Sequence, residues 1–145
     1  MIDLRTEFGK RVEQRLREEP VIWLVTVRAD GTPVPSPVWF YWDGRSVLVY
    51  SQPNAAKVRN IEQNPRVSLH LDHGGAPHGE AGGNVVILTG VARIDRQLPL
   101  VNEMPGFTKK YVDSGLVAAS GSDLQDLARA FSLAIRITPT SLRGL

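Results

Sequence analysis

Two cations and an amide lie close together on one short predicted helix. Residues 55–63 read AAKVRNIEQ, and positions three apart on a helix share a face. Lys57 and Asn60 can therefore reach the same anion, while Arg59 points elsewhere or lies at the rim of that face. The first turn of the helix adds free backbone N–H groups and a partial positive charge. The pattern indicates an anion site, and a solvated surface helix is the alternative.

A second stretch is suited to a flat ring system. Residues 36–42 read SPVWFYW, which combines a proline with four aromatic residues, and Pro33 and Pro35 precede it in the same predicted strand. Because proline cannot donate to a strand ladder, such a strand keeps unpaired backbone groups. Those groups could read the edge of a planar heterocycle while the aromatic rings flank it. The alternative is an aromatic strand of the hydrophobic core.

Other kinds of chemistry have little support in the sequence. There is no cysteine, which excludes disulfides, thiolate catalysis and cysteine zinc sites. Nucleophile-elbow, P-loop and dinucleotide-binding motifs are missing, so no catalytic residue is predicted. Potential metal ligands gather between residues 70 and 80 without a known ligand spacing, and no metal site is expected. These ligand types are His70, Asp72, His73, His78 and Glu80.

The composition indicates a single globular domain over residues 1–145. Hydrophobic residues make up 42% and charged residues 22%, and the formal net charge is only +2. Such a small excess of cations argues against nucleic-acid binding. The charged N-terminal segment is no signal peptide, and no apolar run approaches the roughly 20 residues that span a bilayer. We therefore expect a cytoplasmic protein with no membrane partner.

The predicted elements are mostly short strands joined by tight turns. An amphipathic helix over 3–19 precedes strands at 21–27, 33–42 and 45–51. Asp-Gly pairs between these strands tolerate the positive φ of tight hairpins, so the three strands are expected to form an antiparallel meander. Further strands are expected at 66–72, 84–94, 131–138 and 140–145, with a loop at 73–83 and helices near 107–113 and 122–130. Six or seven mostly antiparallel strands predict a mainly β (α+β) fold that closes into a barrel, with short helices at its periphery.

Several residues have predicted local roles within these elements. Asn54 is expected to cap the helix at 55–63, and Ser122 with Gln125 has capping-box spacing. Gly90 within its strand indicates a β-bulge or a close backbone approach. Alternation predicts inward side chains in two strands, namely Val67, Leu69, Leu71, Phe131, Leu133, Ile135 and Ile137.

Two segments, GTPVPSPVWFYWDGRSVLVYS and AAKVRNIEQNPRVSLHL, resemble the pyridoxamine-phosphate-oxidase-like split β-barrel family. More narrowly, they resemble its branch of flavin/deazaflavin oxidoreductases that use the cofactor F420. The resemblance extends over most of the chain, through TGVARI to the closing TPTSLRGL. It implies an antiparallel split β-barrel of six to seven strands and a homodimer with two cofactor sites at the subunit interface.

The resemblance also implies residue roles. Lys57 and Asn60 would hold the cofactor phosphate, and Arg59 matches the same motif. Family members often carry a second cation just before the lysine, where this chain has Ala55, so helix N–H groups would have to compensate. The loop 73–83 would face the partner's site. The remaining cofactor contacts would come from Ser51, near the phosphate or ribityl chain, and from Ser36, Pro37, Val38 and Trp39, along the rings.

The implied activity is F420-dependent hydride transfer between the deazaflavin and a small organic molecule with a conjugated C=C bond or a similar acceptor. FMN in the same groove is the alternative, because no residue pattern reads the one ring atom that distinguishes the two cofactors. A non-enzymatic F420- or heme-binding protein is a further alternative. Heme would need an axial ligand, and the imidazoles are His70, His73 and His78.

Overall fold

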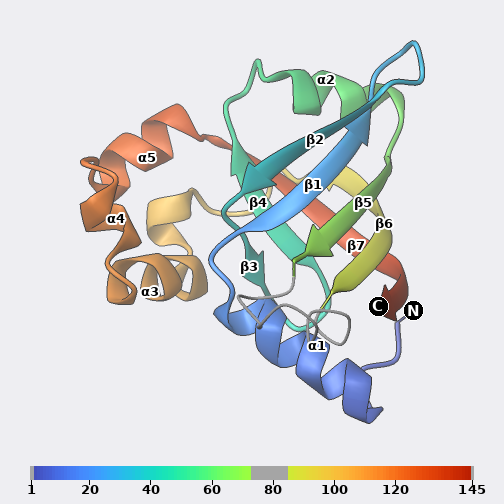
Figure 1. Cartoon of the computed structure of the whole chain (residues 1–145). Helices are drawn as coiled ribbons and strands as arrows, with labels where there is room; N and C mark the ends of the chain where they lie inside the picture. Colours follow the sequence, from blue (N-terminus) through green and yellow to red (C-terminus); the bar gives the residue numbers. More distant parts are fainter. Residues whose placement is uncertain (1, 73–84, 145) are drawn as a thin grey trace.

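The computed structural model describes residues 2–72 and 85–144, and within them one antiparallel sheet of seven strands curls around the core (Figure 1). The strand order across the sheet is β2-β1-β5-β6-β7-β4-β3. This arrangement confirms the predicted mainly β fold class. The strands are β1 (Ile22–Val27), β2 (Pro33–Val38), β3 (Tyr41–Trp42), β4 (Val47–Ser51), β5 (Arg66–Leu71), β6 (Val86–Ile94) and β7 (Leu133–Gly144).

Short helices surround the sheet. In Figure 1 the first helix crosses the lower end of the sheet, the second lies at the upper end, and three more form a group beside it. Thr6 caps the first helix, and its hydroxyl accepts a hydrogen bond from the Gly9 N–H, so the helix starts later than the predicted 3–19. The helices are α1 (Glu7–Glu18), α2 (Ala56–Gln63), α3 (Pro105–Asp113), α4 (Leu116–Ala119) and α5 (Leu124–Ala130), with the 3-10 helix η2 at Val101–Glu103.

The predicted meander is wrong at its second strand. The stretch 33–42 divides into β2, which pairs with β1, and β3, which pairs with β4. These two strands are at opposite ends of the strand order, and Trp39 and Phe40 carry the chain from one edge to the other. The break has a physical cause, since side chains from α3 take the place of a neighbouring strand at Phe40.

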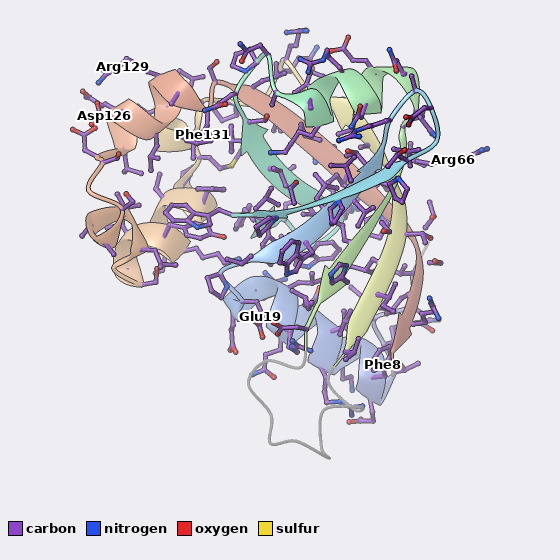
Figure 2. The ribbon with its side chains drawn as sticks, turned by 45° about the horizontal axis from the view of Figure 1, so that its top comes forward. Phe8, Glu19, Arg66, Asp126, Arg129 and Phe131 are labelled. Carbon is purple, nitrogen blue, oxygen red and sulfur yellow. The ribbon has the colours of Figure 1, made fainter. Side chains whose placement is uncertain are left out.

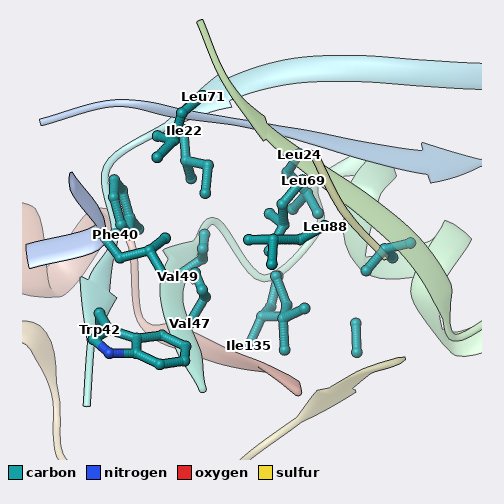
Figure 3. Packing of buried hydrophobic residues seen from close by; sticks show 14 of the residues in the cluster. Ile22, Leu24, Phe40, Trp42, Val47, Val49, Leu69, Leu71, Leu88 and Ile135 are labelled. Carbon is teal, nitrogen blue, oxygen red and sulfur yellow. The ribbon is translucent and has the colours of Figure 1, made fainter. Parts of the chain in front are cut away.

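The core lies on the inner face of the curled sheet. Figure 3 shows its side chains converging from strands that are far apart in the sequence. The predicted inward positions of β5 and β7 are confirmed, because alternate residues of a strand face the same side. Phe131 is the exception: it is 36% exposed, because it ends α5 and β7 begins only at Leu133.

The local details were predicted less well. Ala55 caps α2 without a side-chain bond, whereas the Asn54 carbonyl accepts from the Arg59 guanidinium at 2.7 Å. In α5 the capping box is formed by Asp123 and Asp126, one residue later than predicted, because Asp123 is the last extended residue before the helix. The bulge at Gly90 is confirmed by a register shift there. The predicted loop 73–83 lies outside the described residues, and the predicted final strand is continuous with β7.

Candidate functional site

A pocket of about 370 Å³ lies between the sheet and the group of helices α3–α5. Its volume is at the small end of the range for small-molecule sites, roughly 300–1,000 Å³. Figure 2 shows Phe131 on the side of α5 that faces the sheet, with Asp126 and Arg129 on the outer side. Residues 37–39, which the sequence analysis placed along the rings of a cofactor, lie in the wall of this pocket. The lining residues are Pro37, Val38, Trp39, Tyr50, Val101, Phe107, Ser120, Leu127 and Phe131.

The position of Trp39 in this wall is set by α3. Its indole stacks on the Tyr111 ring with the centroids 4.5 Å apart and the planes 7° from parallel. The Tyr111 hydroxyl accepts from the Phe40 N–H at 2.7 Å and lies 2.7 Å from the Pro20 carbonyl oxygen. Lys110 Nζ donates to the Phe40 carbonyl at 2.9 Å and sits 3.6 Å from the centre of the Phe40 ring. Four contacts therefore hold the residues that follow β2.

Burial changes the ionisation of these two α3 residues. It lowers the pKa of Lys110 to about 7, which nearby Glu19 partly opposes, and it raises the pKa of Tyr111. Sequence reasoning missed both residues. The predicted helix near 107–113 placed them on an element, but no local pattern connected them with Phe40, about seventy residues earlier.

The hydroxyl groups of the pocket are already bonded to the backbone. Tyr50 Oη donates to the Pro99 carbonyl at 2.6 Å, and Ser120 Oγ donates to the Val117 carbonyl at 2.6 Å. Burial raises the pKa of Tyr50 to about 12, so its phenol is neutral at physiological pH. The Trp39 indole N–H, by contrast, donates to no residue that the structure describes.

The free edge of β2 carries carbonyl groups. The Arg28 N–H donates to the Thr32 carbonyl at 2.9 Å, which makes this pair a hydrogen-bonded one. Pairs alternate along an antiparallel ladder, so Pro33, Pro35 and Pro37 occupy the non-hydrogen-bonded positions opposite β1. Their carbonyls point away from β1, and prolines have no N–H. Residues 33–38 therefore offer acceptors at this edge, without the N–H groups expected from the sequence.

The predicted anion site begins one residue beyond the pocket wall. Tyr50 lines the pocket, and its neighbour Ser51 ends β4 just before α2. Ser51 is buried and donates to the Gln52 carbonyl. Asn60 is also buried, and its amide donates to the Thr26 hydroxyl at 3.0 Å, so this donor connects α2 to β1. Neither residue lines the pocket.

Lys57 differs from its neighbours on α2. It is half-buried, and it forms no hydrogen bond or ion pair with another residue in the described part of the chain. Burial lowers its pKa, because no described anion compensates for the lost hydration. Arg59 is exposed and bonded to the Asn54 carbonyl. A half-buried ammonium with no counter-ion among the described residues fits an anionic group such as a phosphate.

The histidines do not form a further site in the described part of the chain. His70 stacks on Trp23 on the outer face of the sheet, with the ring centres 6.0 Å apart. His73, His78 and Glu80 lie outside the described residues, and the described ones contain no cluster that could hold a metal ion. None of the helices in the described part of the chain has the length and apolar character of a membrane-spanning segment.

Comparison with known proteins places this site in context. Residues 8–141 match the family model described as pyridoxamine 5'-phosphate oxidase, whereas no curated protein matches the sequence. An F420 reductase superposes with a TM-score of 0.60 at 22% identity, covering 90% of this chain and 94% of that chain. The heme storage protein HutZ from Vibrio cholerae superposes with a TM-score of 0.65 at 19% identity, covering 96% and 95%.

An FAD-binding protein from Mesorhizobium loti gives a TM-score of 0.60 at 18% identity, covering 94% of this chain and 90% of that chain. At these identities the likeness shows a shared fold. The three structures differ in what they bind, so the choice among F420, flavin and heme has to be argued from the residues of this chain.

Proposed function

The chain belongs to the pyridoxamine 5'-phosphate oxidase family, and from that premise we propose that it is an F420-dependent oxidoreductase. It would transfer a hydride between the deazaflavin and a small organic molecule that carries a conjugated C=C bond or a similar acceptor. FMN in the same position is the second candidate, because the fold is shared with an FAD-binding protein.

The observation that carries this proposal is the state of Lys57. Its ammonium is half-buried on the first turn of α2 and has no partner among the described residues. A phosphate there would supply the missing counter-charge in a charge-assisted bond, and the N-terminus of the helix would add to the attraction. Ser51 and Asn60 would support the site by fixing the start of α2 against the sheet.

The ring system would then extend along residues 36–39 toward the pocket. When bound, the cofactor supplies the hydride chemistry. The backbone of residues 36–39 would face the edge of the rings, while the side chains of Pro37, Val38 and Trp39 form a wall of the adjoining pocket, with Trp39 held parallel to Tyr111. The apolar pocket would select the substrate by shape. None of its lining side chains is an acid or a base poised for proton transfer.

We further propose that the protein is a homodimer in which the partner completes each site. Trp23 of β1, His70 of β5 and Ile87 of β6 are adjacent in the sheet register and point to its outer face. These side chains are only partly exposed and include a stacked aromatic pair. An apolar row of this kind across three strands suits contact with a second copy.

Titration of the purified protein with F420, FMN and heme tests the proposal. We expect Lys57→Ala to weaken F420 binding by about 1.5–3 kcal/mol, or roughly 10- to 150-fold, because a charged hydrogen bond is lost. Lys109→Ala is the matched control, since it removes the same charge from an exposed position on α3. Fluorescence of the deazaflavin would follow the binding.

The outcomes separate the candidates. Equal affinity in the wild type and Lys57→Ala would remove the phosphate assignment. Binding of FMN without F420 would move the function to the flavin, and binding of heme alone would favour a storage role. An enzyme must also oxidise the reduced cofactor faster when an organic acceptor is added than in buffer alone.

A further inference from the structure

We propose that the pocket takes an uncharged, planar molecule with a conjugated carbonyl group, and that the indole N–H of Trp39 donates a hydrogen bond to that carbonyl. The description of this molecule as a substrate rests on the proposed function. The chemistry of the pocket itself rests only on its lining residues.

We infer that the ligand is uncharged because the residues that line the pocket are uncharged. None of the nine lining residues carries a charge. Lys110, three residues after the lining residue Phe107, is engaged by the carbonyl and the ring of Phe40 and is not part of the lining. A carboxylate or an ammonium group would lose its hydration in this pocket without gaining a partner, which is strongly unfavourable.

The carbonyl group of the ligand is inferred from the hydrogen-bond donors that remain free in the pocket lining. The lining side chains with polar protons are those of Trp39, Tyr50 and Ser120. Both hydroxyls give their protons to backbone carbonyls at 2.6 Å. The indole N–H is therefore the donor left among the described lining side chains, and a ligand that accepts one hydrogen bond would use it.

The rigidity of Trp39 makes this donor suitable for recognition. Stacking on Tyr111 fixes the indole plane, and the bonds from α3 to Phe40 fix the backbone beside it. A donor that is already oriented binds with little loss of side-chain entropy. The neighbouring wall of Pro37 and Val38 favours a flat molecule over a bulky one.

The role in the reaction follows from this geometry. A hydrogen bond to the carbonyl oxygen draws electron density away from the conjugated β-carbon. A bound reduced cofactor would supply a hydride to that carbon and release a proton to solvent, and the α-carbon would take up a proton from solvent. The C=C bond would thus be reduced by two electrons as the cofactor is oxidised by two, and the Trp39 N–H would stabilise the negative charge on the carbonyl oxygen while keeping its own proton.

Two neutral probes and one anionic probe of similar shape test binding to the pocket in the absence of cofactor. These are 2-acetylnaphthalene, 2-isopropenylnaphthalene, in which a CH₂ group replaces the oxygen, and 2-naphthoate. By calorimetry we expect the ketone to bind about 2- to 12-fold more tightly than the alkene, the effect of one neutral hydrogen bond. Naphthoate should bind more weakly than the ketone. In the infrared spectrum, the ketone stretch should shift to lower frequency on binding.

Variants assign the effect to Trp39. Trp39→Phe keeps a ring over Tyr111, and in it the preference for the ketone and the infrared shift should both disappear. Trp42→Phe should keep both, because it removes an indole N–H that donates to Glu13 and Trp42 does not line the pocket. Leu127→Trp should fill the pocket and abolish binding of all three probes, whereas Leu124→Trp on the same helix is the control, because Leu124 does not line the pocket.

The inference would be overturned by an unchanged preference for the ketone in Trp39→Phe, by tightest binding of naphthoate, or by failure of the ketone to bind. If Trp39→Phe does not fold, the infrared shift in the wild type decides, since an unshifted ketone has no donor. These outcomes are separate from those for the cofactor. Probe selectivity without F420 or FMN binding would contradict the proposed function alone, and cofactor binding without probe selectivity would contradict this inference alone.

Discussion

Phe40 has its backbone bonded by side chains of a helix, where a strand would normally provide the partners. Its N–H donates to the Tyr111 hydroxyl and its carbonyl accepts from Lys110. A buried backbone group without a partner costs roughly 1–3 kcal/mol, so these two residues stabilise the passage from β2 to β3. Because Trp39 directly precedes Phe40, the same bonds set one wall of the pocket.

Lys110 predicts a dependence of stability on pH. Burial lowers its pKa from 10.5 to about 7 in the folded protein. Between these values the unfolded chain binds more protons, so the contribution of Lys110 to the free energy of unfolding rises with pH. We therefore expect the stability of the wild type relative to Lys110→Met to increase from pH 7 to 10.5, as measured by urea unfolding.

The exposed neighbour provides the comparison for this experiment. Lys109→Met removes a charge one residue away without changing a buried group. Its stability relative to the wild type should vary little over the same pH range. If the difference in the free energy of unfolding between the wild type and Lys110→Met also stays constant over this pH range, the ammonium is not desolvated in the folded protein.

At the scale of the elements, the ladder between β6 and β7 depends on one glycine. The register shifts between Thr89 and Gly90, because Thr89 pairs with Ser141 and Gly90 with Pro139, which leaves one extra residue on β7. A Cβ atom at Gly90 would lie 2.7 Å from the Thr138 carbonyl oxygen, which belongs to the backbone and cannot swing away. Position 90 therefore requires glycine, because the backbone of β7 leaves no room for a side chain there.

Gly90→Ala should lower the free energy of unfolding by roughly 1–3 kcal/mol, because the methyl group forces the two strands apart. Urea denaturation would measure the change. Val91→Ala is the control on the same strand, since Val91 is 45% exposed and its truncation should change stability by no more than about 0.5 kcal/mol. An unchanged midpoint for Gly90→Ala would mean that the ladder adjusts without cost.

At the scale of the whole molecule, two apolar regions have different roles. The inner core holds the curled sheet together, and a second cluster joins the sheet to α3–α5 around the pocket. The row of Trp23, His70 and Ile87 belongs to neither cluster and lies on the outer face. This third apolar surface is where the proposed dimer would form.

Sedimentation tests the dimer. The chain has a mass of 16.0 kDa, and the proposal predicts that the wild type sediments at about twice that value. Trp23→Glu places a charge in the proposed contact and should shift the protein to the monomer. Leu100→Glu alters another exposed apolar residue away from this face and should leave the dimer intact. A wild type that sediments as a monomer would contradict the proposal.

The sequence by itself determined the features that depend on local pattern. Alternation located β5 and β7, the spacing of Lys57 and Asn60 placed them on one short helix, and Gly90 indicated its bulge. The family was also readable from these segments, since the model match covers residues 8–141. Such features are encoded within a few residues, because strand and helix periodicities act over that distance.

Only the tertiary structure decided how stretch 33–42 divides and what the pocket contains. Tyr111 meets Phe40 across 71 positions, and no local pattern shows which distant side chain will satisfy a given backbone group. The same holds for Lys57, because its lack of a partner among the described residues depends on every element packed around α2. A backbone donor or a buried charge is satisfied by whatever the folded chain brings within about 3 Å, and the fold alone sets that proximity.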